Sequence, residues 1–122
     1  MKKRILIIDD EEDFCSLFQK TLTGEDYEVI TALSGKEGIE KIKEFHPDII
    51  FLDLKMPKIN GIETLGHLKR MKNNVPVVIF TAYPSMDTAL KGHYLNIYDY
   101  MTKPFSLEKV RKVIKKALGE SR

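Results

Sequence analysis

The stretch IIFLDLKMP, residues 49–57, decides how the rest of the chain is interpreted. Its four consecutive large apolar residues predict a short strand that is covered on both faces, as the central strands of parallel sheets are. Asp53 follows them directly. A carboxylate at the end of a core strand is costly unless something pairs with it. The position of Asp53 therefore raises the question of what its partner is and why a charge is placed there.

Short β-rich runs alternate along the chain with helical patterns. The predicted strands cover residues 4–8, 27–32, 48–53, 76–80 and 97–101. Between them, apolar residues recur at a spacing near 3.6, which is typical of amphipathic helices. The expected core faces of the helices contain Phe14, Leu17, Phe18 and Leu22; Ile39, Ile42 and Phe45; Ile62, Leu65 and Leu68; and Leu107, Val110, Val113, Ile114, Ala117 and Leu118. Residues 34–37, SGKE, form a capping box, and Gly119 is a plausible helix stop.

This alternation predicts an α/β fold with a doubly wound, five-stranded parallel sheet and five flanking helices. At 122 residues, the chain is expected to form one domain, residues 1–122. A net charge of +2 gives no strong field to attract nucleic acid or a membrane surface. The single cysteine excludes an internal disulfide and a thiolate metal cluster, and it indicates a reducing, cytoplasmic location.

Polar residues gather where the predicted strands end, which is where such sheets bind ligands. They are Asp9, Asp10, Asp53, Thr81 and Lys103. Three carboxylates together repel one another, and a hard divalent cation such as Mg²⁺, or Mn²⁺ in its place, removes that conflict. A carboxylate beside a metal ion, an ammonium and a hydroxyl is a suitable nucleophile toward phosphorus, and the product is an aspartyl phosphate.

Five short motifs occur in order over essentially the whole chain: IDD (8–10), LDLKMP (52–57), NG (60–61), FTAY (80–83) and TKPF (102–105). With them the sequence resembles the receiver domain of bacterial two-component and phosphorelay response regulators, including the single receivers of the chemotaxis type. The resemblance implies a flavodoxin-like fold with strand order 2-1-3-4-5. It also implies a signalling switch that undergoes Mg²⁺-dependent self-catalysed phosphorylation and slow autodephosphorylation, and that is not an enzyme.

The resemblance assigns a role to each site residue. Asp53 accepts the phosphoryl group from a phosphohistidine on a sensor kinase or a phosphotransfer protein. Asp10 binds Mg²⁺ directly, Asp9 binds it through water, and the backbone carbonyl of Lys55 completes the protein ligands. Lys103 pairs with the phosphoryl oxygens. In the switch step Thr81 moves toward the phosphate and lets Tyr100 turn inward, which alters the face made by the fourth helix, fifth strand and fifth helix.

Two further sets of residues follow from the same resemblance. The side chains of Lys55 and Tyr83 influence how water reaches the phosphorylated aspartate, and their bulk predicts a comparatively long-lived phosphoaspartate. Residues of the first helix are expected to contact the kinase or phosphotransfer partner: Glu11, Glu12, Cys15, Ser16 and Gln19. Cys15 is expected to be an ordinary, half-exposed residue. A downstream protein or output domain receives the signal, with no direct contact to nucleic acid or membrane.

Two alternative functions use the same residues. Phosphatases resembling the haloacid dehalogenases also have a strand-end aspartate nucleophile, but they carry a second acid two residues later, where this chain has Lys55. A degenerate receiver that binds partners without phosphate is disfavoured because all five strand-end residues are present. The sequence leaves open whether the chain acts alone or belongs to a larger regulator.

Overall fold

The computed structural model describes residues 2–53, 66, 75–81, 97–102 and 106–119. In these residues the strands are β1 (Lys3–Ile8), β2 (Tyr27–Ala32), β3 (Ile49–Asp53), β4 (Val77–Thr81) and β5 (Ile97–Thr102), and the helices are α1 (Glu12–Thr23), α2 (Gly35–Phe45) and α5 (Leu107–Ala117). Every predicted strand is confirmed, with its ends shifted by no more than one residue. The other two expected helices, one of them containing Ile62, Leu65 and Leu68, lie outside the described residues.

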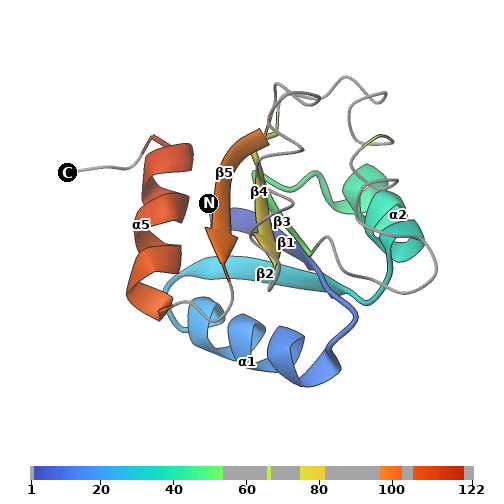
Figure 1. The fold of residues 1–122 in the computed structure, drawn as a ribbon, viewed down its shortest axis with the longest axis horizontal. Helices are drawn as coiled ribbons and strands as arrows, with labels where there is room; N and C mark the ends of the chain where they lie inside the picture. Colours follow the sequence, from blue (N-terminus) through green and yellow to red (C-terminus); the bar gives the residue numbers. More distant parts are fainter. Residues whose placement is uncertain (1, 54–65, 67–74, 82–96, 103–105, 120–122) are drawn as a thin grey trace.

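The strands form one parallel sheet in the order β2-β1-β3-β4-β5, as predicted (Figure 1). Strand β1 therefore pairs with β3 although a helix, a strand and another helix separate them in the sequence. In this register Ile8 lies beside Leu52, and Asp53 lies beside Phe80 of β4. The residues that follow β1 and β3 consequently emerge next to each other at one edge of the sheet.

Apolar residues cover both faces of the central strands. On one face, the sheet packs against α1 and α5, with Phe18 and Ile114 in the same buried cluster as Phe51. On the opposite face, a second cluster joins Ile42 of α2 to Ile8 and neighbouring strand residues. Figure 1 shows this arrangement, with α1 and α5 together on one side of the sheet and α2 on the other. The continuous apolar runs in β1 and β3 are explained by burial from both sides.

Helix α1 differs from its prediction at one position. Phe14, Phe18 and Leu22, spaced four residues apart, turn toward the sheet, whereas the side chain of Leu17 is 66% exposed. The prediction that Leu17 belongs to the core face was wrong. Successive residues of a helix are rotated by about 100° about its axis. When Phe18 faces the sheet, the preceding residue, Leu17, therefore lies on the side of the helix and is exposed to solvent.

Helix α5 is tied to the turn that follows α1. Ser106 caps its amino end by accepting a hydrogen bond from the Lys109 amide (3.1 Å), and Gly119, with φ +72°, ends it as predicted. The Arg111 Nε donates to both carboxylate oxygens of Glu25, at 2.7 and 2.5 Å. These hydrogen bonds hold the pKa of Glu25 below its usual value, although partial burial opposes the shift. An ion pair thus links segments 86 residues apart.

Helix α2 approaches the sheet very closely at Gly38. Its amino end is capped as predicted: Ser34 Oγ accepts from the Glu37 amide (3.1 Å), while the Glu37 carboxylate accepts from the Leu33 amide (2.7 Å). A Cβ at Gly38 would lie 2.5 Å from Cδ1 and 2.8 Å from Cγ1 of Ile8, which is fully buried. Since Ile8 immediately precedes Asp9, this contact fixes the end of β1.

We therefore expect Gly38→Ala to destabilise the protein by about 1–3 kcal/mol, because the added methyl group overpacks a rigid β-branched neighbour. The matched control is Gly24→Ala, where the new Cβ would meet only ordinary contacts at 3.6 and 3.9 Å and φ is −66°. That change should be neutral or stabilising by up to about 1 kcal/mol. Urea unfolding of both variants measures the difference, and equal effects would contradict the steric explanation.

Candidate functional site

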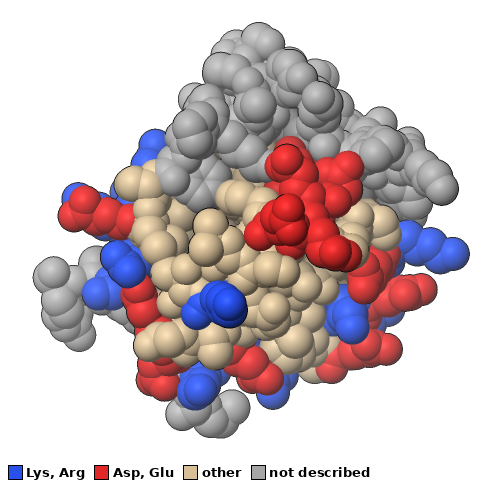
Figure 2. Space-filling view, turned by 90° about the horizontal axis from the view of Figure 1, so that it is seen from below, with Lys and Arg blue, Asp and Glu red and all other residues tan. Residues whose placement is uncertain are grey.

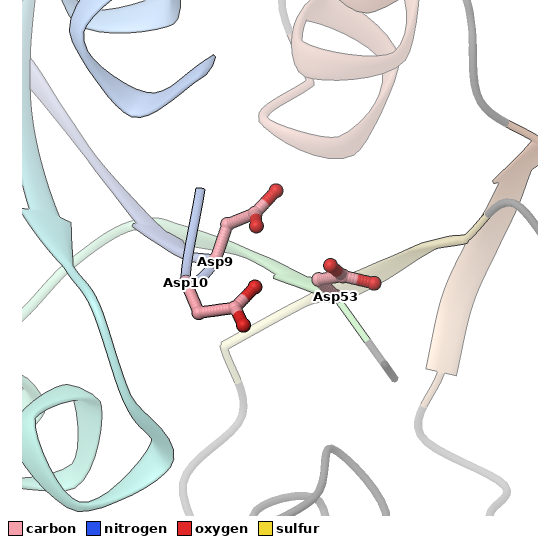
Figure 3. Close-up of side chains that lie close together, drawn as sticks. All are labelled: Asp9, Asp10 and Asp53. Carbon is pink, nitrogen blue, oxygen red and sulfur yellow. The ribbon is translucent and has the colours of Figure 1, made fainter. Parts of the chain in front are cut away.

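Three carboxylates meet where β1 and β3 end. Asp9 and Asp10 follow β1, and Asp53 is the last residue of β3. One carboxylate oxygen from each lies within 4.8 Å of the other two. Figure 3 shows Asp10 pointing across toward Asp53, with Asp9 beside it on the same connection. The structure thus brings together three of the five residues that the sequence placed at this edge.

The three aspartates differ in exposure. Asp9 is 0% exposed and Asp53 is 4% exposed, and they are the charged side chains that are buried among the described residues. Asp10 is exposed to solvent. Two carboxylates of the cluster are therefore buried and the third is open to solvent. Low solvent access strengthens the electrostatic repulsion among them.

The set of donor atoms suits a hard divalent cation. Carboxylate oxygens are the ligands that Mg²⁺ and Ca²⁺ bind in proteins, and Mg²⁺ usually takes one or two carboxylates and keeps several waters. One oxygen from each of Asp9, Asp10 and Asp53 can face a common point, and the exposed side of Asp10 leaves room for water. The residues present fit an oxygen-coordinated cation, and among the described residues this is the acidic cluster with that geometry.

The other expected site residues are described in part or not at all. Thr81 ends β4 and pairs through the backbone with Thr102 of β5, so it lies at the same edge of the sheet as Asp53. Tyr100 lies within β5, where its backbone pairs with Ile79. Lys55, Tyr83 and Lys103 fall outside the described residues, and so do the side chains of Thr81 and Tyr100. Their predicted roles stay predictions.

The expected partner-contact residues of the first helix fall into two groups. Glu11, which immediately precedes α1, and Glu12 and Ser16 within it are exposed, and Figure 2 shows acidic side chains gathered over the amino end of this helix. Cys15, by contrast, is only 2% exposed, so the prediction of a half-exposed cysteine was wrong, and its side chain is turned away from any partner. Gln19 is partly buried and donates from Nε2 to the Val29 carbonyl of strand β2 at 2.8 Å.

Sequence analysis missed an apolar groove between α1 and α5. It has a volume of about 250 Å³ and is lined by Phe14, Leu17, Phe18, Thr21 and Leu107. The rings of Phe14 and Phe80 lie 5.6 Å apart, and those of Phe18 and Phe51 lie 5.2 Å apart, so the groove rests on an aromatic cluster that reaches β3 and β4. Helical periodicity assigned Leu17 to the core, so no signal in the sequence indicated this groove.

Comparison with known proteins agrees with this geometry. Residues 5–115 match the family model described as the response regulator receiver domain. The chain is 40% identical over 121 residues to the alkaline phosphatase synthesis transcriptional regulatory protein PhoP of Bacillus subtilis, covering 99% of this chain and 50% of PhoP. It is 31% identical over 118 residues to sporulation initiation phosphotransferase F of the same organism, covering 97% of this chain and 95% of that protein.

Solved structures give the same result. The response regulator TrrA of Thermotoga maritima, solved with Mg²⁺-BeF, superposes with a TM-score of 0.85 at 32% identity, over 95% of this chain and 99% of TrrA. A CheY-like receiver domain protein of Methanospirillum hungatei gives a TM-score of 0.90 at 28% identity, over 98% and 96% of the two chains.

The chain belongs to the response regulator receiver domain family. Receiver domains are the phosphoacceptor switches of two-component systems, and the fold and strand order found here are theirs. The chain spans half the length of PhoP and about a quarter of the length of the transcriptional regulatory proteins named ZraR that it also matches. None of the helices in the described part of the chain is long and apolar enough to span a membrane.

Proposed function

We propose that the chain is a phosphoacceptor in which Asp53 takes a phosphoryl group from a phosphohistidine of a sensor kinase or a phosphotransfer protein. The observation that carries the proposal is the position of Asp53 at the end of a central strand, with its carboxylate within 4.8 Å of those of Asp9 and Asp10. A phosphorylatable carboxylate and the acidic groups that would hold a cation are thus adjacent. TrrA, a structural relative, was solved with Mg²⁺-BeF.

The reaction needs few groups from the protein. A carboxylate oxygen of Asp53 attacks phosphorus and forms the new P–O bond, while the P–N bond to the donor imidazole breaks and its electron pair stays on the nitrogen. Asp9, Asp10, Asp53 and the backbone carbonyl of Lys55 would hold Mg²⁺, or Mn²⁺ in its place. When bound, the cation neutralises negative charge on the transferring phosphoryl group. Lys103 supplies a second positive charge at this group.

The phosphorylated state acts on the protein rather than on an external substrate, so the chain functions as a switch and not as an enzyme. Thr81 hydrogen-bonds the phosphoryl group, and Tyr100 responds by moving inward. Backbone pairing supports this route, because Thr81 and Tyr100 lie on the adjacent strands β4 and β5. Both the fifth strand and α5 belong to the face that carries the output. Lys55 and Tyr83 slow the attack of water on the phosphoaspartate. All of these groups belong to a single domain, residues 1–122.

The donor protein docks beside the site, over the amino half of α1. Glu11, Glu12 and Ser16 are exposed at the amino end of α1, and the apolar groove that Leu17 lines lies on the same helix. A partner that fits carries an apolar side chain flanked by basic residues. The downstream partner is a protein or an output domain, with no direct binding to nucleic acid or membrane, and the cytoplasm is the proposed location.

Phosphorylation of the purified chain by acetyl phosphate tests the proposed function. We expect an intact-mass gain of about 80 Da that requires both Mg²⁺ and Asp53, because the carboxylate is the nucleophile and the cation offsets its charge. Asp53→Asn should show no gain. Asp26→Asn is the matched control, since this exposed aspartate has a φ of +71° that asparagine also tolerates. An undiminished gain in Asp53→Asn would overturn the proposal.

The docking surface is tested with Leu17→Asp. A kinase that phosphorylates the wild type rapidly, selected from a panel of purified histidine kinases, should transfer to this variant at least about tenfold more slowly, because a new charge in an apolar contact is strongly disfavoured. Phosphorylation by acetyl phosphate should be unchanged. Leu33→Asp is the control, because Leu33 is also an exposed apolar residue but lies outside the groove. Equal slowing of both variants would argue against docking at this groove.

A further inference from the structure

The main chain of Asp9 is fixed by groups from two other parts of the fold. Its amide donates to the carbonyl of Ala32, the last residue of β2, at 3.0 Å. Its carbonyl accepts a hydrogen bond from the Sγ of Cys15, in the first turns of α1, at 3.3 Å. Its side-chain Oδ1 accepts from the amide of Glu11, also at 3.0 Å. The residue that carries the most buried carboxylate of the site is therefore held on all of these sides.

The thiol is the group of Cys15 that reaches Asp9. The backbone amide of Cys15 already donates to the Glu11 carbonyl at 3.0 Å, as the first helical hydrogen bond of α1. The Asp9 carbonyl precedes the helix and is therefore not an acceptor in the backbone hydrogen bonds of α1. With 2% of its surface exposed, Cys15 makes its contact in a buried environment, where a hydrogen bond competes little with water.

The consequence for the site follows from the planarity of the peptide unit. The Asp9 carbonyl and the Asp10 amide belong to one rigid plane. Fixing the direction of that carbonyl sets ψ of Asp9 and φ of Asp10 together, and these two angles set the relative directions of the Cα–Cβ bonds from which the two carboxylates extend. A thiol on α1 thus acts on both carboxylates that β1 contributes to the acidic cluster.

We propose that Cys15 is a positioning residue of the cation site, acting through its hydrogen bond to the Asp9 carbonyl. This inference rests on the proposed function, because it assumes that Asp9, Asp10 and Asp53 hold Mg²⁺. Cys15 itself touches neither the cation nor the phosphoryl group. Its role is to keep the Asp9–Asp10 peptide in the orientation that lets both carboxylates face Asp53.

Two substitutions separate the hydrogen bond from packing. Cys15→Val keeps an apolar side chain of similar size but removes the donor, whereas Cys15→Ser keeps a donor but is smaller and more polar. In a buried, apolar position Ser should lower the free energy of unfolding more than Val does. For Mg²⁺ affinity the expected order is reversed: Cys15→Ser, which keeps a hydrogen-bond donor, should bind Mg²⁺ more tightly than Cys15→Val. Leu22→Val, a buried substitution farther along α1, is the control for general loosening of the helix.

The experiment measures the Mg²⁺ dissociation constant of each purified protein by isothermal titration, together with hydrogen exchange of the Glu11 amide in the metal-free proteins. We expect Cys15→Val and Cys15→Ala to bind Mg²⁺ about three- to tenfold more weakly than the wild type, with faster exchange at Glu11. Cys15→Ser should retain most of the affinity in spite of its lower stability. Leu22→Val should lose stability and keep the wild-type dissociation constant.

Three results would overturn the inference. Equal Mg²⁺ dissociation constants for the wild type and Cys15→Val would show that the thiol does not position the site. Affinity that falls in step with stability across all four variants, including Leu22→Val, would show a packing role alone. In both cases a wild type that binds Mg²⁺ and accepts phosphate leaves the proposed function intact. A wild type that binds no Mg²⁺ would overturn the inference and the proposed cation site together.

Discussion

Electrostatic repulsion among Asp9, Asp10 and Asp53 is the constraint that the surrounding fold has to accommodate. At separations of up to 4.8 Å and an effective dielectric constant of about 20, each pair of ionised carboxylates repels by on the order of 3 kcal/mol. Two of the three side chains are buried, so water relieves little of this energy. A protein of ordinary stability holds such a cluster only where the surrounding fold is rigid and a cation can offset the charge.

The parallel sheet supplies that rigidity. Strands β1 and β3 are neighbours in the interior of the sheet. Near their carboxyl ends Ile8 and Leu52 lie beside each other, and both are fully buried. Gly38 allows α2 to lie directly against Ile8, one residue before the first aspartate. On the other face, the aromatic rings of Phe51 and Phe80 support the end of β3. The carboxylates are therefore held by a dense core from both sides, and the repulsion cannot be relieved by a small movement of the strand ends.

Much of this arrangement could be predicted from the sequence because its signals are local. Short β-rich runs, three of them continuously apolar, marked the strands to within one residue, and the residues after the first and third runs identified the acidic cluster. The errors concern features that depend on distant contacts. Leu17 and Cys15 are neighbours of core residues in α1, and only the packing of α1 against the sheet and α5 decides which of them is buried. The ion pair of Glu25 with Arg111 joins residues too far apart in the sequence for any local pattern to indicate it.

Unfolding measurements with and without Mg²⁺ test the carboxylate cluster most directly. At matched ionic strength, Asp53→Asn should be more stable than the wild type without the metal, because one repelling charge is removed. Millimolar Mg²⁺ should stabilise the wild type, as a ligand that binds only the folded state does, and should stabilise Asp53→Asn much less. Asp13→Asn, an exposed change in α1, should respond to Mg²⁺ as the wild type does. Equal stabilisation of the wild type and Asp53→Asn by Mg²⁺, or none of either, would contradict a cation site built from these three aspartates.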